Sequence, residues 1–209
     1  MSSVSLQSYA FQLRKKLLQG ASLESLLDCH AQHQQFLGEI APRIELSKLS
    51  LADRFAWKFL REINILNPEF ANKINQTEKK SKKKISSYSG EGLYQNLPDI
   101  IKNVQEIWFS DMKSLPNTVW LKQFTIRKLA HCSFKKDEIA FSLVFDFPDV
   151  PAEILSYLAY HELLHRELGV KRLNGRQYAH TREFKSQEQL FPNWRQLDKQ
   201  INEYLYHTI

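Results

Sequence analysis

The spacing of apolar residues predicts that the first third of the chain is helical. Across residues 5–19 apolar side chains recur every three or four positions, which is the period of a helix that buries one face. A second helix is predicted over residues 22–40. A third begins at Ser50, where Asp53 three residues later is typical of a capping box, and its apolar stripe ends before Asn67. We therefore interpret these segments as a helical unit.

The middle of the chain interrupts this pattern. Residues 71–97 are polar and rich in lysine, and they include a serine-rich turn segment. We predict a loop or linker here and a division of the chain into two parts. The first is a helical N-terminal region with a lysine-rich linker (residues 1–92), and the second is a separate domain (residues 93–209).

The second half alternates between helical and strand periodicity. Helical spacing returns over Asp99–Phe109. Residues that favour strands are frequent in Thr118–Arg127, and larger apolar residues alternate with other side chains in Glu138–Phe145, so both segments are predicted strands. Helices combined with a short β-sheet predict an α+β fold class.

Further helices are predicted towards the C-terminus. Pro151 suits the first turn of a helix that runs to about Leu168, and Gly169 suits the position just after its end. The residues that follow are predicted to form a loop. The last helical region begins at about Thr181 and is interrupted at Pro192.

Composition places the chain among folded globular proteins of a reducing compartment. An apolar content of 43%, with thirteen Phe and eight Tyr, is enough to build a core. Cys29 and Cys132 cannot form a disulfide framework, and the first residues lack the apolar stretch of a signal peptide. The longest apolar runs are too short to span a bilayer. We expect a cytoplasmic protein without membrane contact.

The net charge of +6 comes mainly from the N-terminal part of the chain. The densest group of cations consists of Lys79, Lys80, Lys82, Lys83 and Lys84. Such a run is usually a solvated loop, although a weak contact with nucleic acid or another anionic surface stays open. Aromatic residues that would stack on bases are scarce around it.

The motif that carries chemistry is H-E-x-x-H at residues 161–165, inside the predicted helix over residues 151–168. Residues four apart lie on one helix face, so the imidazoles of His161 and His165 can reach a single ion. Glu162 projects at a neighbouring angle, which suits a base that takes a proton from water at that ion. The spacing predicts a zinc site with Glu162 as general base. Two histidines without a metal are the alternative.

A zinc site that keeps an open position for water needs a third protein ligand. His180 follows a helix end and a turn, so the chain can return it to the first helix. We therefore choose His180, with Glu183 or Glu188 as the fallback. The other histidines have less support as ligands. His30 and His33 are expected to be exposed on a polar helix, His131 precedes a strand, and His207 lies near the C-terminus.

The H-E-x-x-H motif and the segment from His180 to Phe184 together resemble the SprT-like zinc metallopeptidases and their small gluzincin relatives. In that family an H-x-x-x-F segment supplies the third zinc ligand, which corresponds to His180 here. The order of helix, strands and active-site helix is similar over roughly residues 93–195. The chain differs from many members in carrying Thr181 where glycine is frequent, and it has no cysteine zinc ribbon.

The resemblance implies a zincin-type domain that hydrolyses peptide bonds. Zn²⁺ would be held by His161, His165 and His180, with Glu162 as the general base and a protein or peptide as the substrate. The resemblance also implies that the strand within Ile139–Phe145 can bind extended substrate by edge pairing, and a packed core strand is the alternative. Four residues near the motif in sequence could help to stabilise the oxyanion, although a structural role is expected for each of them: Tyr157, Tyr160, Arg176 and Tyr178.

Other functions stay open on sequence alone. The chain can be a nucleic-acid-associated protein with a structural zinc, a protease that acts on DNA-bound proteins, or a zinc hydrolase of non-peptide amides. Cys132 as a nucleophile is a weaker hypothesis, because the sequence offers no argument for a supporting base.

Overall fold

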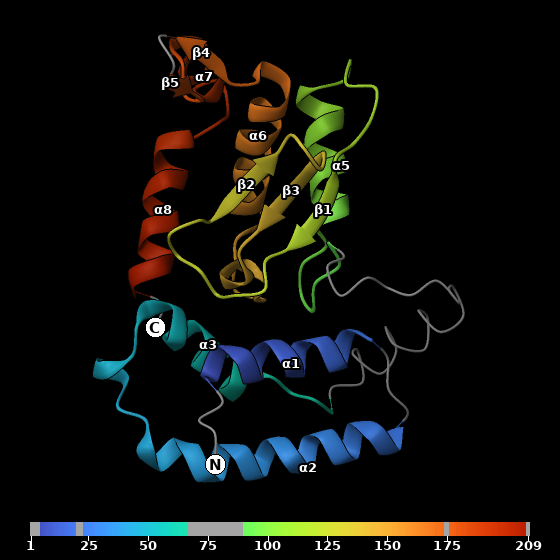
Figure 1. Ribbon diagram of the computed structural model, residues 1–209, viewed down its shortest axis with the longest axis vertical. Helices are drawn as coiled ribbons and strands as arrows, with labels where there is room; N and C mark the ends of the chain where they lie inside the picture. Colours follow the sequence, from blue (N-terminus) through green and yellow to red (C-terminus); the bar gives the residue numbers. More distant parts are fainter. Residues whose placement is uncertain (1–4, 20–22, 67–89, 174–175, 208–209) are drawn as a thin grey trace.

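The computed structural model describes residues 5–19, 23–66, 90–173 and 176–207, and its architecture is α+β. Figure 1 shows helices α1, α2 and α3 at one end of the molecule and a small sheet flanked by helices at the other. This arrangement confirms the predicted fold class and the helical N-terminal region. The lysine run at residues 79–84 lies outside the described residues.

The described elements have the following bounds. The helices are α1 (Leu6–Leu18), α2 (Leu23–Ile40), α3 (Leu51–Glu62), α5 (Leu97–Trp108), α6 (Ala152–Leu168), α7 (Arg182–Glu188) and α8 (Trp194–His207). The strands are β1 (Asn117–Trp120), β2 (Ala130–Ser133), β3 (Glu138–Phe141), β4 (Lys171–Leu173) and β5 (Arg176–Tyr178). Short 3₁₀ turns are η1 (Ala41–Arg43), η2 (Leu46–Lys48) and η3 (Leu143–Phe145).

Serine caps begin two of the N-terminal helices. The hydroxyl of Ser5 accepts a hydrogen bond from the Ser8 amide at 3.2 Å, and Ser50 does the same for Asp53 at 3.2 Å. These bonds satisfy amides that have no partner within the helix. The cap predicted at Ser50 is therefore confirmed.

The larger sheet is mixed, with strand order β1-β3-β2. The central strand β3 pairs in parallel with β1 and antiparallel with β2. The hypothesis that substrate pairs with Ile139–Phe145 is therefore wrong, because both edges of β3 are already occupied. The outer edges of this sheet belong to β1 and β2.

Both predicted strands are shorter than expected. Thr118–Arg127 continues as a strand only to Trp120, and Glu138–Phe145 ends as a strand at Phe141. The hydroxyl of Ser142 donates to the Thr125 carbonyl at 2.6 Å and accepts from the Val144 amide at 3.4 Å, which turns the chain into η3. The residues of η3 are fully buried, so their apolar character reflects the core and not a strand period.

Three strands had no predicted counterpart. β2 is an edge strand of intermediate exposure, without a clear alternation of apolar and polar residues. β4 and β5 form an antiparallel hairpin where a loop was predicted. Strands of three or four residues are too short to give a periodic signal in the sequence.

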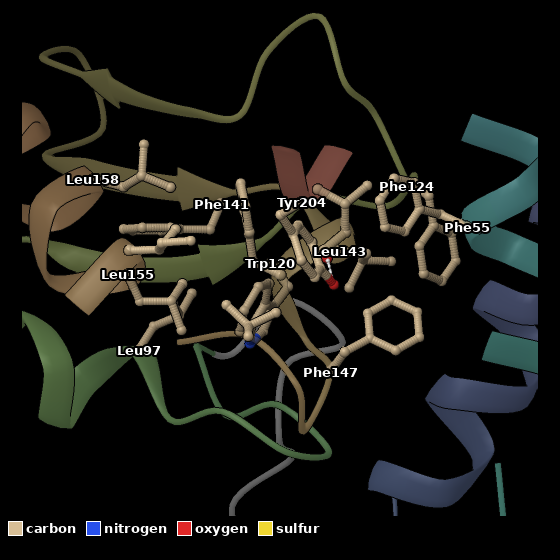
Figure 2. Close-up of a cluster of buried hydrophobic side chains, with 14 of the residues drawn as sticks. Phe55, Leu97, Trp120, Phe124, Phe141, Leu143, Phe147, Leu155, Leu158 and Tyr204 are labelled. Atoms are coloured by element: carbon tan, nitrogen blue, oxygen red, sulfur yellow. Dashed lines mark hydrogen bonds between the residues drawn. The ribbon is translucent and has the colours of Figure 1, made fainter. Parts of the chain in front are cut away.

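One continuous core joins the N-terminal helices to the sheet. Figure 2 shows Phe141, Leu155 and Leu158 on one side of this core, with Phe55 of α3 facing Phe124 on the other. Among these aromatic contacts, the rings of Phe55 and Tyr204 lie 5.8 Å apart between centroids. The division at residue 92 stays a prediction, although apolar side chains pack together on both sides of it.

A buried ion pair also crosses between the two parts of the chain. The Arg14 guanidinium of α1 donates to Asp146 Oδ2 from Nε at 3.0 Å and from Nη2 at 2.8 Å. The same carboxylate accepts the backbone amides of Leu93, Tyr94 and Gln95 at 2.9–3.1 Å. The lone pairs of Asp146 are thus well satisfied, as a buried charge requires.

Helix length and polarity bear on the expectation about membranes. Within the described ranges, every helix falls short of the length or the apolar character that crossing a bilayer requires.

Candidate metal centre

The helix α6 places two imidazoles on one face. It begins after Pro151 and ends at Gly169, whose φ of +67° is readily adopted by glycine. His161 and His165 are four residues apart, which stacks their side chains along one face. Leu155, Ala159 and Leu163 are fully buried and anchor other sides of the helix.

The hairpin β4–β5 returns the chain to this face with a third imidazole. His180 lies just after β5 and just before α7. Thr181 is the N-cap of α7, where its hydroxyl accepts the amide of Phe184 at 3.2 Å. This bond gives Thr181 a local role, since it fixes where α7 begins beside His180.

The three imidazoles point their Nε2 atoms at one another. The Nε2–Nε2 distances are 3.1 Å between His161 and His165, 3.3 Å between His161 and His180, and 3.0 Å between His165 and His180. Tetrahedral zinc with Zn–N bonds of about 2.0–2.1 Å separates its nitrogen ligands by about 3.3–3.4 Å. The observed triangle is close to this value, so the donor set and its spacing fit a zinc ion with a fourth position left for water.

Phe184 packs against all three imidazoles of this histidine cluster. Its ring is fully buried and lies 5.0 Å from the His161 ring, 4.4 Å from that of His165 and 4.8 Å from that of His180, between centroids. The ring of His165 stacks on it with an interplanar angle of 26°. A single apolar side chain therefore supports all three candidate ligands from below.

The surroundings favour neutral imidazoles, which is the form that binds a metal. Burial, together with the neighbouring rings of His161 and His180, lowers the pKa of His165 to about 4. Burial and His161 also lower the pKa of His180. At neutral pH both rings therefore hold an unshared electron pair.

The fallback ligands occupy other places. Glu183 is exposed and pairs with Lys171 at 2.8 Å. Glu188 lies behind His161, where its Oε1 is 2.6 Å from Nδ1, the ring nitrogen that does not face the other two imidazoles. Burial alone would raise the pKa of Glu188, but the hydrogen bond from His161 and the charges around it lower the pKa overall. Neither carboxylate belongs to the group of converging donor atoms.

Glu162 is the buried carboxyl group beside the histidine cluster. It is only 5% exposed, and it accepts a hydrogen bond from the backbone amide of Cys132 in β2. Burial raises its pKa to about 7, against the opposing effects of His161, the Cys132 amide and Lys128. A carboxyl group with a pKa near neutral can both take and return a proton at physiological pH.

The other expected histidines do not join the cluster. His131 lies in β2, and His33 is buried, with its Nε2 2.8 Å from the Leu60 carbonyl. The expectation that His33 is exposed is wrong, because its ring stacks beside Tyr9 of α1 and contacts the Leu60 carbonyl of α3. The side chain of His207 lies outside the described residues.

Two of the four suggested oxyanion donors are engaged elsewhere. The hydroxyl of Tyr160 donates to the Gln187 carbonyl at 2.7 Å, and that of Tyr157 donates to Glu188 at 3.4 Å. Tyr178 is about half exposed, and the side chain of Arg176 lies outside the described residues. Burial and the nearby Glu162 raise the pKa of the Cys132 thiol to about 11, which disfavours this residue as a nucleophile.

Sequence reasoning missed the contacts of Glu188 and Cys132 with this centre. Both depend on pairs of residues about 30 positions apart, and no local pattern indicates such pairs. The chain matches no protein-family model and no curated protein sequence.

Proposed function

We propose that the protein is a zinc-dependent peptidase whose C-terminal part is a zincin-type domain. The observation that carries this proposal is the convergence of three Nε2 atoms, from His161, His165 and His180, within 3.0–3.3 Å of one another. Three unprotonated nitrogens at such distances repel unless they share a cation. Glu162, next to His161 in the sequence, has a buried carboxyl group, and this supports a hydrolytic role for the metal site over a structural one.

Each residue has a distinct part in the proposed reaction. Zinc held by the three imidazoles would polarise a peptide carbonyl and lower the pKa of water. Glu162 accepts the proton of the attacking water and later passes it to the leaving amine. Its raised pKa of about 7 matches this double use. The amide of Cys132 holds the carboxylate in place from β2.

The outer edge of β2 is the best candidate for binding an extended substrate. The Ser142 amide donates to the Leu129 carbonyl at 2.8 Å, so this pair is hydrogen-bonded across the strands. Hydrogen-bonded pairs alternate in an antiparallel ladder, so Ala130 and Cys132 direct their backbone groups away from β3. The Cys132 amide indeed reaches Glu162. A peptide added along this edge would pass the general base.

Metal analysis and a cleavage assay test the proposal together. We expect close to one zinc per chain in the purified protein and loss of that zinc in His161→Ala. Glu162→Gln should keep the zinc and lower the cleavage of unfolded casein by about 100-fold or more. The matched control is Glu167→Gln, an exposed position on the same helix, which should behave like the unaltered protein.

Two results would contradict the proposal. If the purified protein binds no zinc, the assignment of the metal site is wrong. If the zinc-loaded protein cleaves casein equally well with and without Glu162, the assignment of Glu162 as the general base is wrong. If the protein cleaves small amides but not casein, the proposed hydrolytic chemistry holds and the proposed substrate class is wrong.

A further inference from the structure

The carboxylate of Glu188 contacts a candidate metal ligand without being one itself. Its Oε1 lies 2.6 Å from Nδ1 of His161, while Nε2 of the same ring faces His165 and His180. The two nitrogens lie on opposite sides of the imidazole. A carboxylate only accepts hydrogen bonds, so the proton is on Nδ1 and the unshared pair is on Nε2.

Glu188 is in turn held by a second residue of α6. The hydroxyl of Tyr157 donates to Glu188 Oε1 at 3.4 Å, and it also lies beside the carboxyl group of Asp198 in α8. Tyr157 is buried, and about four fifths of the Glu188 side chain is covered. The contacts from Asp198 through Tyr157 and Glu188 to His161 thus join α8, α6 and α7 behind the metal centre.

His161 differs from the other two candidate ligands in this respect. Among the hydrogen bonds of the described residues, none involves Nδ1 of His165 or of His180. Those two rings are positioned by packing on Phe184, which also touches His161. Only His161 is oriented by a charged hydrogen-bond partner, and it is the ligand nearest in sequence to Glu162.

We propose that Glu188 is a positioning residue for the metal centre: it fixes the ring orientation and tautomer of His161 so that Nε2 faces the ion. This inference rests on the metal site of the proposed function but not on peptidase activity. A carboxylate behind a ligating histidine also makes the imidazole a stronger donor, and the loss of such partners typically weakens metal binding by about 10–100-fold.

Zinc affinity measured by competition with a chelator tests the proposal directly. Glu188→Gln keeps the size and an acceptor oxygen but removes the charge, and Glu188→Ala removes the contact altogether. We expect zinc to bind about 10-fold more weakly in the first variant and up to about 100-fold more weakly in the second. Glu183→Gln on the same helix α7 is the control, because Glu183 pairs with Lys171 at the surface, and its zinc affinity should be unchanged.

Two further measurements separate positioning from ligation and from a general loss of structure. The visible spectrum of the cobalt-loaded protein should keep its shape in Glu188→Gln, since the ligand set is unchanged. In a double-mutant cycle with His161→Cys, which keeps a zinc ligand but has no ring for Glu188 to orient, removing Glu188 should cause no further loss of zinc affinity, because its effect passes through that ring. A purely structural role would weaken binding equally in both backgrounds.

The outcomes are distinct from those of the proposed function. Unchanged zinc affinity in both Glu188 variants would overturn the positioning role, and so would an altered cobalt spectrum, which would make Glu188 a ligand. If the Glu188 variants bind zinc more weakly but the unaltered protein cleaves no peptide, the positioning role is supported and the proposed peptidase activity is contradicted. If Glu188→Ala does not fold, the glutamine variant decides alone.

Discussion

Phe184 shows how much the histidine cluster depends on a residue outside the set of candidate ligands. The ring contacts all three imidazoles from one side and is fully buried. Thr181 caps the helix that carries it, so the cap, the phenylalanine and His180 are fixed within five residues. The H-x-x-x-F spacing is therefore a packing requirement as much as a ligand pattern.

We predict that Phe184→Ala destabilises the metal-free protein by about 3–5 kcal/mol, because a buried ring is replaced by a cavity. The same change should weaken zinc binding, since the rings of His165 and His180 lose their support. Urea unfolding with a chelator present measures the first effect. The matched control is Phe134→Ala, whose ring is half exposed and whose loss should cost well under half as much. Equal losses at the two positions would contradict this role of Phe184.

At the residue scale, the sequence was enough to find the candidate ligands but not their neighbours. His161 and His165 follow from helical spacing, and His180 follows from the helix end and turn that precede it. The contacts of Glu188 with His161 and of Cys132 with Glu162 join positions that are far apart in the chain. Such contacts depend on the tertiary fold, which a single sequence does not reveal.

At the scale of elements, β2 is the strand that connects the sheet to the proposed chemistry. Its inner backbone groups pair with β3, and at Ala130 and Cys132 the backbone groups face the outer edge. Proline is tolerated at edge positions whose amide takes no part in the ladder. The alternation along β2 therefore allows the outer edge to be altered without breaking the sheet.

We predict that Ala130→Pro raises the KM for an extended peptide by about 5-fold, which corresponds to the loss of one hydrogen bond of about 1 kcal/mol. Zinc content and kcat should stay close to those of the unaltered protein. His131→Pro is the contrasting variant, because the His131 amide faces β3 and its loss should destabilise the sheet itself. An unchanged KM in a folded Ala130→Pro protein would exclude the β2 edge as the substrate site.

Long helices were predictable at this scale, whereas short strands were not. α1, α3 and α6 bury stripes that repeat over three turns or more, and their bounds lie within a few residues of the prediction. β2, β4 and β5 span only three or four residues each. Their positions are set by pairing with distant or neighbouring strands, which leaves little trace in local composition.

At the scale of the whole molecule, the ion pair between Arg14 and Asp146 joins the N-terminal helix α1 to the segment that follows η3. Both side chains are about 95% buried or more, and Asp146 also binds three backbone amides. A Cβ atom at Gly92 would collide with the Asp146 carboxylate, so only glycine fits this close approach. The contact thus depends on residues from both parts of the chain, Arg14 and Gly92 in the first and Asp146 in the second.

We predict that Arg14→Met lowers the free energy of unfolding by about 3–5 kcal/mol, because it leaves the Asp146 charge buried without its cation. Methionine keeps most of the apolar part of the arginine side chain, so the loss of stability measures the effect of removing the positive charge. Lys48→Met removes an exposed partner of Glu45 and should change stability by less than about 1 kcal/mol. Chemical denaturation of the three proteins under identical conditions makes the comparison, and a loss below about 1 kcal/mol for Arg14→Met would contradict it.

The same contact bears on how small an active fragment can be. A polypeptide that starts at residue 93 would keep every proposed zinc ligand but would lack α1 and α3. Asp146 would then lose the cation that balances its buried charge, and the aromatic surface formed by Phe124, Phe147 and Tyr204 would face water where Phe55 now covers it. Such a fragment is expected to aggregate, so the smallest stable unit that carries the three histidines should include helices that lie at the opposite end of the molecule from them.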